Sequence, residues 1–248
     1  MIPKVIHYCW FGGKALPRSV KKCIRTWKKM CPDYVIKEWN ESNFDLDFCP
    51  YVREAYDHKY YAFVSDVARL YALYYEGGIY MDIDVELKKP LDSFLYHVGF
   101  CGYESRNELG TAILASEKGT TWVKDNLEVY LHSQFILPDG RKNLLTNVKR
   151  LTKYFMAYGL RADNTHQDIT HEMTVYPKTV FCPLCWDNKP SQFSDKTVAI
   201  HHFEGSWLPE DERLRLKYPK WYTWIYYFYW LPKYEFKTKI LRQDVKRK

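Results

Sequence analysis

Residues 65–84 read SDVARLYALYYEGGIYMDID, a predicted helix that leads through two glycines into an extended segment. The first half places apolar side chains three or four residues apart, as in an amphipathic helix with one face in the core. This helix should end near Glu76, because Gly77 and Gly78 readily adopt the left-handed and extended conformations that terminate helices. A predicted strand therefore starts one tight turn after a predicted helix.

The segment after the glycines alternates in character. Side chains of an extended chain repeat every two residues, so Tyr80, Asp82 and Asp84 should share one face and the apolar residues between them the other. Two carboxylates at such range repel unless a cation joins them. Their oxygen atoms suit a hard divalent cation. The alternative is an exposed strand end that carries two acids without a metal.

A polar face of the predicted helix lies one turn away from these acids. Ser65, Asp66 and Arg69 fall together on a side of the helix away from its apolar stripe. A local ion pair between Asp66 and Arg69 is one interpretation, and it would stabilise the helix only slightly. A polar helix face beside an acidic strand end also predicts a ligand site.

The stretch from Ser65 to Asp84 closely resembles the sugar-nucleotide signature of glycosyltransferase family thirty-two. Serine, the spaced acids, arginine, the paired glycines, tyrosine and Asp-x-Asp all fall in register. That family includes α-mannosyl-, α-galactosyl- and capsular-polysaccharide transferases, and it is similar to the catalytic domain of the large glucosylating toxins. The resemblance implies a GT-A fold, a sugar-nucleotide donor contacted by residues such as Ser65, a divalent metal (Mn²⁺ or Mg²⁺), and retention of anomeric configuration.

The N-terminal run from Ile2 to Gly13 resembles the start of that family's nucleotide-binding half. Residues 5–11 are β-branched and aromatic and end in a Gly-Gly turn, which predicts a first strand followed by a loop. Trp10 stands at the carboxyl end of this strand, where open α/β sheets bind ligands. The resemblance implies that the Trp10 ring stacks on the donor base.

The run from residue 198 to 207 resembles the loop that supplies the third metal ligand in related transferases. A predicted strand ends here at His201 and His202, and imidazole binds metals such as manganese. We expect His202 to be the ligand, on the His-Phe-x-Gly pattern, with His201 as the alternative. The resemblance also implies that Ser206 and Trp207 contact the diphosphate and close over the donor. A buried His-His strand end without a metal is the other interpretation.

The chemistry of sugar transfer suggests a role for each residue of the signature. Breaking a sugar–diphosphate bond builds negative charge on the leaving group, which a divalent ion stabilises as a Lewis acid. We expect Asp84 to be a direct metal ligand and Asp82 to hold the donor ribose or the metal. Arg69 should meet phosphate or sugar hydroxyls, Asp66 should bind sugar hydroxyls, and Tyr80 should form a wall of the pocket.

No nucleophile is evident in the sequence. A front-face transfer, in which the acceptor hydroxyl attacks on the leaving-group side and the diphosphate takes its proton, requires none. Glu104 lies just after a predicted strand and can contact donor or acceptor, with Glu108 as a weaker option.

Strands and helices alternate along the N-terminal half, which favours a Rossmann-like α/β fold with a mostly parallel central sheet flanked by helices. The length of 248 residues suits one such domain, which we place at residues 1–217. Outside the opening stretch we expect strands at 34–39, 98–103, 110–115, 175–181 and 197–202, and helices at 17–30, 121–132 and 143–158.

Composition bears on the partners. The net charge is +7, and 18% of the residues are aromatic, which suits sugar rings and also membrane interfaces. Residues 218–248 hold an aromatic band and a basic tail, which resembles an anchor on an anionic membrane surface. A packed helix with a solvated tail is the alternative. Nucleic acid is not an expected partner, because no reading module or basic stripe is recognisable.

Seven cysteines are an odd number, and no signal peptide precedes them, so we expect a cytoplasmic protein, peripheral on the inner face of the membrane if the tail binds there. Cys182 and Cys185 have the spacing of half a zinc site, but no second pair completes it.

Together with these observations, the resemblance implies a metal-dependent retaining glycosyltransferase. It would move a sugar from a nucleotide-diphosphate donor, UDP-sugars being favoured, to a saccharide or lipid-linked saccharide in the synthesis of cell-surface polysaccharide such as capsule. The alternative is a lectin-like protein that binds carbohydrate without turnover.

Overall fold

The computed structural model describes residues 1–184 and 191–205. The chain divides into two compact units, Met1–Phe203 and Glu204–Lys248. Every helix and strand described below belongs to the first unit. The predicted aromatic and basic segment at 218–248 lies outside the described residues, as does Cys185 of the half zinc site.

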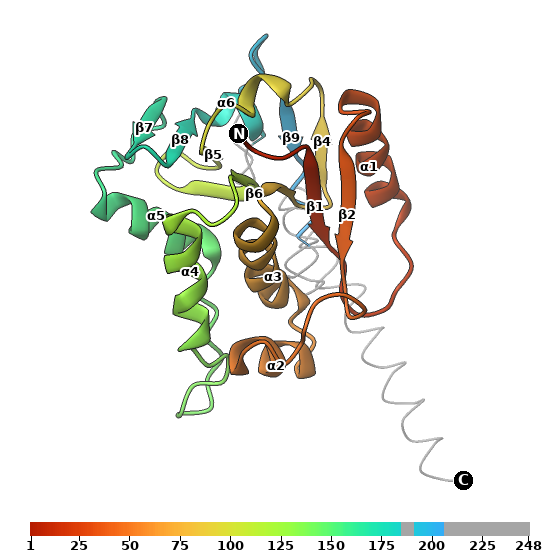
Figure 1. Ribbon diagram of the computed structural model, residues 1–248, viewed down its shortest axis with the longest axis vertical. Coiled ribbons are helices and arrows are strands. Elements are labelled where there is room, and N and C mark those ends of the chain that lie inside the picture. Colours follow the sequence, from red (N-terminus) through yellow and green to blue (C-terminus); the bar gives the residue numbers. More distant parts are fainter. Residues whose placement is uncertain (185–190, 206–248) are drawn as a thin grey trace, which may run out of the picture. The chain divides into compact units, whose positions relative to one another are not determined.

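A seven-stranded sheet forms the centre of the first unit (Figure 1). Its strands follow one another across the sheet in the order β2, β1, β3, β6, β5, β8, β7. β1, β2, β3, β5 and β8 run in one direction, while β6 and β7 run in the other. The prediction of a mostly parallel sheet is therefore confirmed. The strands are β1 (Val5–Cys9), β2 (Val35–Trp39), β3 (Gly78–Met81), β5 (Gly99–Tyr103), β6 (Leu109–Ser116), β7 (Gln167–Ile169) and β8 (Met173–Tyr176).

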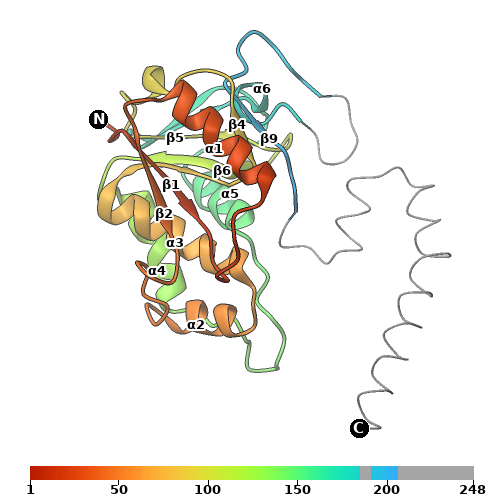
Figure 2. The ribbon, with the colours of Figure 1, turned by 90° about the vertical axis from the view of Figure 1, so that its right-hand side faces the viewer.

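Helices cover both faces of the sheet, as Figures 1 and 2 show from two sides. On one face the core contains α2, α3, α4 and α5. On the other face, residues of α1, α6 and a small second sheet pack together. The helices are α1 (Arg18–Met30), α2 (Pro50–Asp57), α3 (Tyr61–Glu76), α4 (Thr121–Leu131), α5 (Asn147–Ala157) and α6 (Lys178–Phe181), with a 3₁₀ turn η1 (Asp92–Phe94).

Side chains of β3 divide between these two cores with the expected period of two. Ile79 and Met81 enter the core beside α1, while Tyr80 enters the core beside α3. The alternation predicted from the sequence is therefore confirmed as far as Met81.

The glycines at the end of α3 set the start of β3. Gly77 and Gly78 have φ angles of +69° and +110°, which disfavour any other residue. A Cβ on Gly78 would lie 2.8 Å from the carbonyl oxygen of Val5, so the close pairing of β3 with β1 also requires glycine. The carbonyl oxygen of Gly77 accepts a hydrogen bond from His7 Nε2 on β1 at 2.8 Å.

The second sheet joins β4 (Val85–Leu87) to β9 (Ala199–His201) in antiparallel pairing. The register sets His201 opposite Val85, directly after the Asp-x-Asp. Val85 also accepts a hydrogen bond at its carbonyl oxygen from the Trp27 indole on α1, at 2.7 Å. The C-terminal strand thereby reaches the acidic segment.

Three predicted elements differ from the structure by more than two residues at one end. The strand after the glycines ends at Met81, because the amide of Val85 donates to the carbonyl oxygen of Asp82 at 3.0 Å and closes a turn. The strand expected at 175–181 ends at Tyr176, since Pro177 cannot donate a ladder hydrogen bond, and α6 follows. α5 begins at Asn147, later than expected. Within residues 1–184 and 191–205, no helix is long and apolar enough to cross a membrane.

Candidate active site

The two acids lie on the turn that leads from β3 to β4. The backbone amide of Asp82 donates to the carbonyl oxygen of Ala112 on β6 at 2.8 Å, which holds the turn against the central sheet. The Asp84 side chain is 11% exposed and that of Asp82 is 27% exposed. Asp82 and Asp84 converge although they are not on a common strand face, so the predicted pair is brought together by a turn.

His201 reaches the acids from β9. Its Nε2 lies 3.4 Å from Asp84 Oδ1, and the backbone amide of His202 donates to the carbonyl oxygen of Asp84 at 3.0 Å. One ligand atom each from Asp82, Asp84 and His201 lie within 4.8 Å of one another. Two carboxylates and an imidazole form a donor set that suits Mn²⁺ or Mg²⁺ better than a soft metal.

The electrostatics of His201 follow from this placement. Burial by itself lowers the pKa of His201, but the carboxylate of Asp84 and the nearby Cys182 side chain raise it well above its usual value. Negative charge therefore accumulates at this point of the fold, and a cation of either kind, a proton or a metal ion, is stabilised there.

His202 points elsewhere. Its Nε2 lies 3.0 Å from Glu86 Oε2, and its side chain is 38% exposed. Neighbouring residues at a strand end point to opposite sides, so His201 and His202 cannot both face Asp84. We expected His202 to be the third metal ligand beside Asp82 and Asp84, and this geometry does not match that expectation. The alternative ligand, His201, is the histidine that faces the two acids.

The side chain of Arg69 connects helix α3 to the turn that carries Asp82. Its Nη2 is 3.1 Å from Asp66 Oδ1 and 3.4 Å from Asp82 Oδ1. Its Nη1 donates to the carbonyl oxygen of Thr111 at 2.8 Å, and its guanidinium lies 4.4 Å from the Tyr80 ring centre. The side chain is only 6% exposed. We expected this guanidinium to meet donor phosphate or hydroxyls, but its nitrogens instead tie two carboxylates to the sheet.

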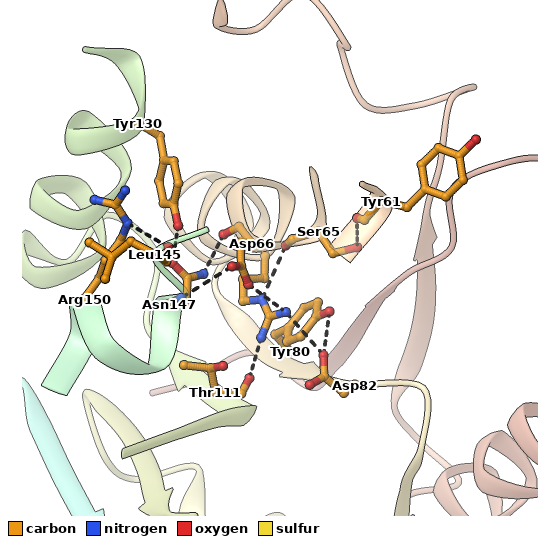
Figure 3. A network of polar contacts seen from close by, with 11 residues as sticks. Tyr61, Ser65, Asp66, Tyr80, Asp82, Thr111, Tyr130, Leu145, Asn147 and Arg150 are labelled. Atoms are coloured by element: carbon orange, nitrogen blue, oxygen red, sulfur yellow. Dashed lines mark hydrogen bonds and ion pairs between the residues drawn. The ribbon is translucent and has the colours of Figure 1, made fainter. Parts of the chain in front are cut away.

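Tyr80 completes this contact, because its hydroxyl donates to Asp82 Oδ1 at 3.0 Å. Ser65 Oγ donates to the carbonyl oxygen of Tyr61 at 3.0 Å, and the Ser65 carbonyl accepts from Arg69 Nε at 3.3 Å (Figure 3). The polar helix face and the acidic turn predicted from the sequence therefore meet in one network.

Asp66 is held from a second helix. The backbone amide of Asn147 donates to Asp66 Oδ2 at 3.4 Å, and its side-chain amide donates to the Asp66 carbonyl at 2.8 Å (Figure 3). Asn147 Oδ1 in turn accepts from the Tyr130 hydroxyl on α4 at 2.6 Å. Burial raises the pKa of Asp66 to about 6, although the charge of Arg69 opposes this shift.

Sequence reasoning did not identify Asn147 or Thr111. Asn147 lay inside the helix predicted at 143–158, and its place at the start of α5 could not be recognised because the helix begins later than predicted. Thr111 contributes a backbone carbonyl, which leaves no signature in the sequence.

Trp10 and Glu104 lie at the same edge of the sheet as the acids. β1, β3 and β5 run in one direction, and Trp10, Asp82 and Glu104 each follow the carboxyl end of one of them. Trp10 is half-buried, and its indole N–H donates to the carbonyl oxygen of Lys14. Ser206 and Trp207 lie outside the described residues.

Comparisons with known proteins agree with this geometry. A family model described as "Glycosyltransferase sugar-binding region containing DXD motif" matches residues 17–100, which include both acids of the turn. An uncharacterized glycosyltransferase of Acanthamoeba polyphaga mimivirus is 35% identical over 221 residues, covering 84% of this chain and 85% of that protein.

Two further similarities are partial. Inositol phosphoceramide mannosyltransferase 3 of Schizosaccharomyces pombe is 30% identical over 125 residues, which are 48% of this chain and 34% of that relative. The chain thus spans about a third of its length. The solved structure "PaToxG Glycosyltransferase" has a TM-score of 0.50 at 22% identity, covering 63% of this chain and 69% of that one. The extended match to the viral protein, together with the shared fold, shows that this chain belongs to the DXD-containing glycosyltransferase family and has its GT-A-type α/β fold.

Proposed function

We propose that this protein is a metal-dependent, retaining glycosyltransferase that uses a nucleotide-diphosphate sugar, with UDP-sugars favoured. The observation that carries the proposal is the convergence of Asp82, Asp84 and His201 beside the network of Arg69 and Asp66. Carboxylates from the turn between β3 and β4 would not gather beside His201 of β9 for packing alone, because like carboxylates repel.

Each residue of the candidate site would have its own role in the reaction. Asp84 and His201 would bind Mn²⁺ or Mg²⁺ directly, and the cation would stabilise the charge of the leaving diphosphate. Asp82 would hold the cation or the donor ribose while Arg69 and Tyr80 fix its carboxylate. Asp66, fixed by Arg69, would bind sugar hydroxyls.

Retention fits a front-face reaction, in which the acceptor hydroxyl attacks on the side of the leaving diphosphate and gives that group its proton. Such a reaction needs no protein nucleophile. The Trp10 ring, at the carboxyl end of β1, would stack on the base of the donor.

Acceptor and setting are proposed from the sequence and the relatives. The fission-yeast relative is named for transfer of mannose to a lipid, which supports a lipid-linked saccharide among the acceptors and GDP-mannose among the donors to be tried. We propose a role in cell-surface polysaccharide synthesis, at the cytoplasmic face of a membrane that the basic tail binds.

The function is tested by donor hydrolysis, which needs no acceptor. The full chain is incubated with Mn²⁺ and, separately, UDP-galactose, UDP-glucose, UDP-N-acetylglucosamine and GDP-mannose, and release of the nucleoside diphosphate is measured. We expect one donor to release its nucleoside diphosphate. This release should stop when a chelator is added and resume when Mn²⁺ is added back. Binding of saccharides without release from any donor would favour the lectin-like alternative.

The membrane proposal has a separate test. The full chain should sediment with vesicles that contain anionic lipid, and neutralising its tail should release it. Equal sedimentation of both proteins would contradict the proposal. The residues to be changed to glutamine are Lys233, Lys237, Lys239, Arg242, Lys246, Arg247 and Lys248.

A further inference from the structure

One buried polar atom beside the candidate metal site has no partner among the described residues. His201 presents Nε2 to Asp84, whereas its Nδ1 is buried and makes no hydrogen bond within residues 1–184 and 191–205. A buried N–H without an acceptor is destabilising, because it has lost its hydrogen bond to water and gained none in the protein. Histidines that bind metals almost always donate their second ring N–H to a carboxylate, a carbonyl or a water, which fixes the tautomer and the ring orientation.

A small cavity adjoins His201. Its volume is about 10 Å³, and its lining includes His201, Glu104 and Cys182. This is about the space that one water molecule requires. Glu104 and His201 thus line the same small cavity.

The fold brings Glu104 to this place by close packing. A Cβ on Gly110 would lie 3.1 Å from Glu104 Cβ, so glycine on β6 leaves room for the Glu104 side chain. The backbone of Glu104 is held as well, because its amide donates to the carbonyl oxygen of Glu108 at 3.1 Å. The thiol of Cys182 contacts the carbonyl oxygen of Glu104 at 4.0 Å.

We infer that Glu104 is a positioning residue, which accepts the Nδ1–H of His201 through one water molecule and so presents Nε2 to the cation. Cys182 is the competing partner because its side chain also interacts with His201, but a thiol is a weak hydrogen-bonding group. The inference rests on the metal-dependent transfer proposed above.

To test this, the full chain is titrated with Mn²⁺. The affinity is measured from the electron paramagnetic resonance signal of the free ion. Loss of an outer partner of a metal-binding histidine typically weakens metal binding about 10–100-fold. We expect such a loss in Glu104→Leu, near-normal affinity in Glu104→Gln, which keeps an oxygen acceptor, and near-normal affinity in Cys182→Ala. Thermal unfolding of each variant shows whether it is folded.

Two further variants distinguish positioning of the His201 ring by Glu104 from a direct effect of the Glu104 charge on the cation. Glu108→Leu removes a neighbouring acid that does not line the cavity, and it should leave Mn²⁺ affinity unchanged. In a His201→Ala background, Glu104→Leu should cause no additional loss, because the residue acts through His201. An additional loss there, or a loss in Glu104→Gln as large as that in Glu104→Leu, would show a charge effect and overturn the inference.

The failures can be told apart. If the unaltered chain binds no Mn²⁺, the proposed metal-dependent function and this inference fail together. If the unaltered chain binds Mn²⁺ and folded Glu104→Leu binds it equally well, or if only Cys182→Ala weakens binding, the inference alone fails.

Discussion

His201 Nε2 lies 3.4 Å from Asp84 Oδ1, although the two residues are far apart in the sequence. The contact exists because β9 pairs with β4, and β4 begins immediately after Asp84. The C-terminal strand therefore completes a site that the signature segment begins.

The first prediction concerns Asp84. Asp84→Asn keeps the size of the side chain but removes the charge that would hold the cation, so Mn²⁺ affinity and donor hydrolysis should fall at least about 100-fold, more than for an outer partner. Circular dichroism should remain unchanged. Glu86→Gln is the matched control, since Glu86 contacts His202 instead, and near-normal turnover in Asp84→Asn would remove this residue from the site.

The second prediction separates the two histidines. His201→Asn should weaken Mn²⁺ binding, whereas His202→Asn should leave it nearly unchanged, because His202 pairs with Glu86 and is partly exposed. Titration of both variants with Mn²⁺ compares them directly. The reverse result would restore His202 as the ligand.

The third prediction concerns Asn147. Asn147→Ala removes the donor to the Asp66 carbonyl and the acceptor of the Tyr130 hydroxyl, so the free energy of unfolding should fall by about 1–3 kcal/mol. Urea denaturation measures this change. Asn107→Ala, at an exposed position, should cost much less, and equal losses in the two variants would argue against a special role for the Asn147 contacts.

The fourth prediction concerns pH and His7. Trp39 Nε1 donates to His7 Nδ1 at 3.1 Å, so the ring is neutral and Nε2 carries the proton donated to Gly77. Burial lowers the pKa of His7 below its usual 6.5. The folded state then binds fewer protons than the unfolded state, so this contribution to stability is complete above pH 6.5 and declines as the pH falls below it.

The decline can reach about 1.4 kcal/mol per pH unit for one proton. It is measured as the difference in unfolding free energy between the unaltered chain and His7→Gln, followed from pH 7 to pH 5 by urea denaturation. At pH 7 the unaltered chain should be the more stable of the two, because the substituted glutamine keeps only part of the native contacts. This difference in unfolding free energy should become smaller as the pH falls. A difference that does not change with pH would contradict a lowered pKa of His7.

Much of the fold could be predicted because its information is local. The spacing of apolar residues predicted α3, and the glycine pair marked its end, since both depend on neighbours along the chain. The alternation from Ile79 to Met81 likewise predicted that the two apolar side chains share one face, and this face enters a core. Tyr80, expected as a wall of the pocket, is buried in the other core. The turn at Asp82 was missed, because a backbone hydrogen bond to Val85 ends the strand where the side-chain pattern continues.

By itself, the sequence determined that Asp82, Asp84, Asp66 and Arg69 stand close together, because one helix, one glycine turn and one strand connect them. Tertiary structure alone decided that His201 faces Asp84, and that Asn147 and Thr111 hold Asp66 and Arg69. The reason is physical: those choices depend on the register of β9 against β4 and on the packing of α5 and β6 against α3, which are contacts between segments distant along the chain.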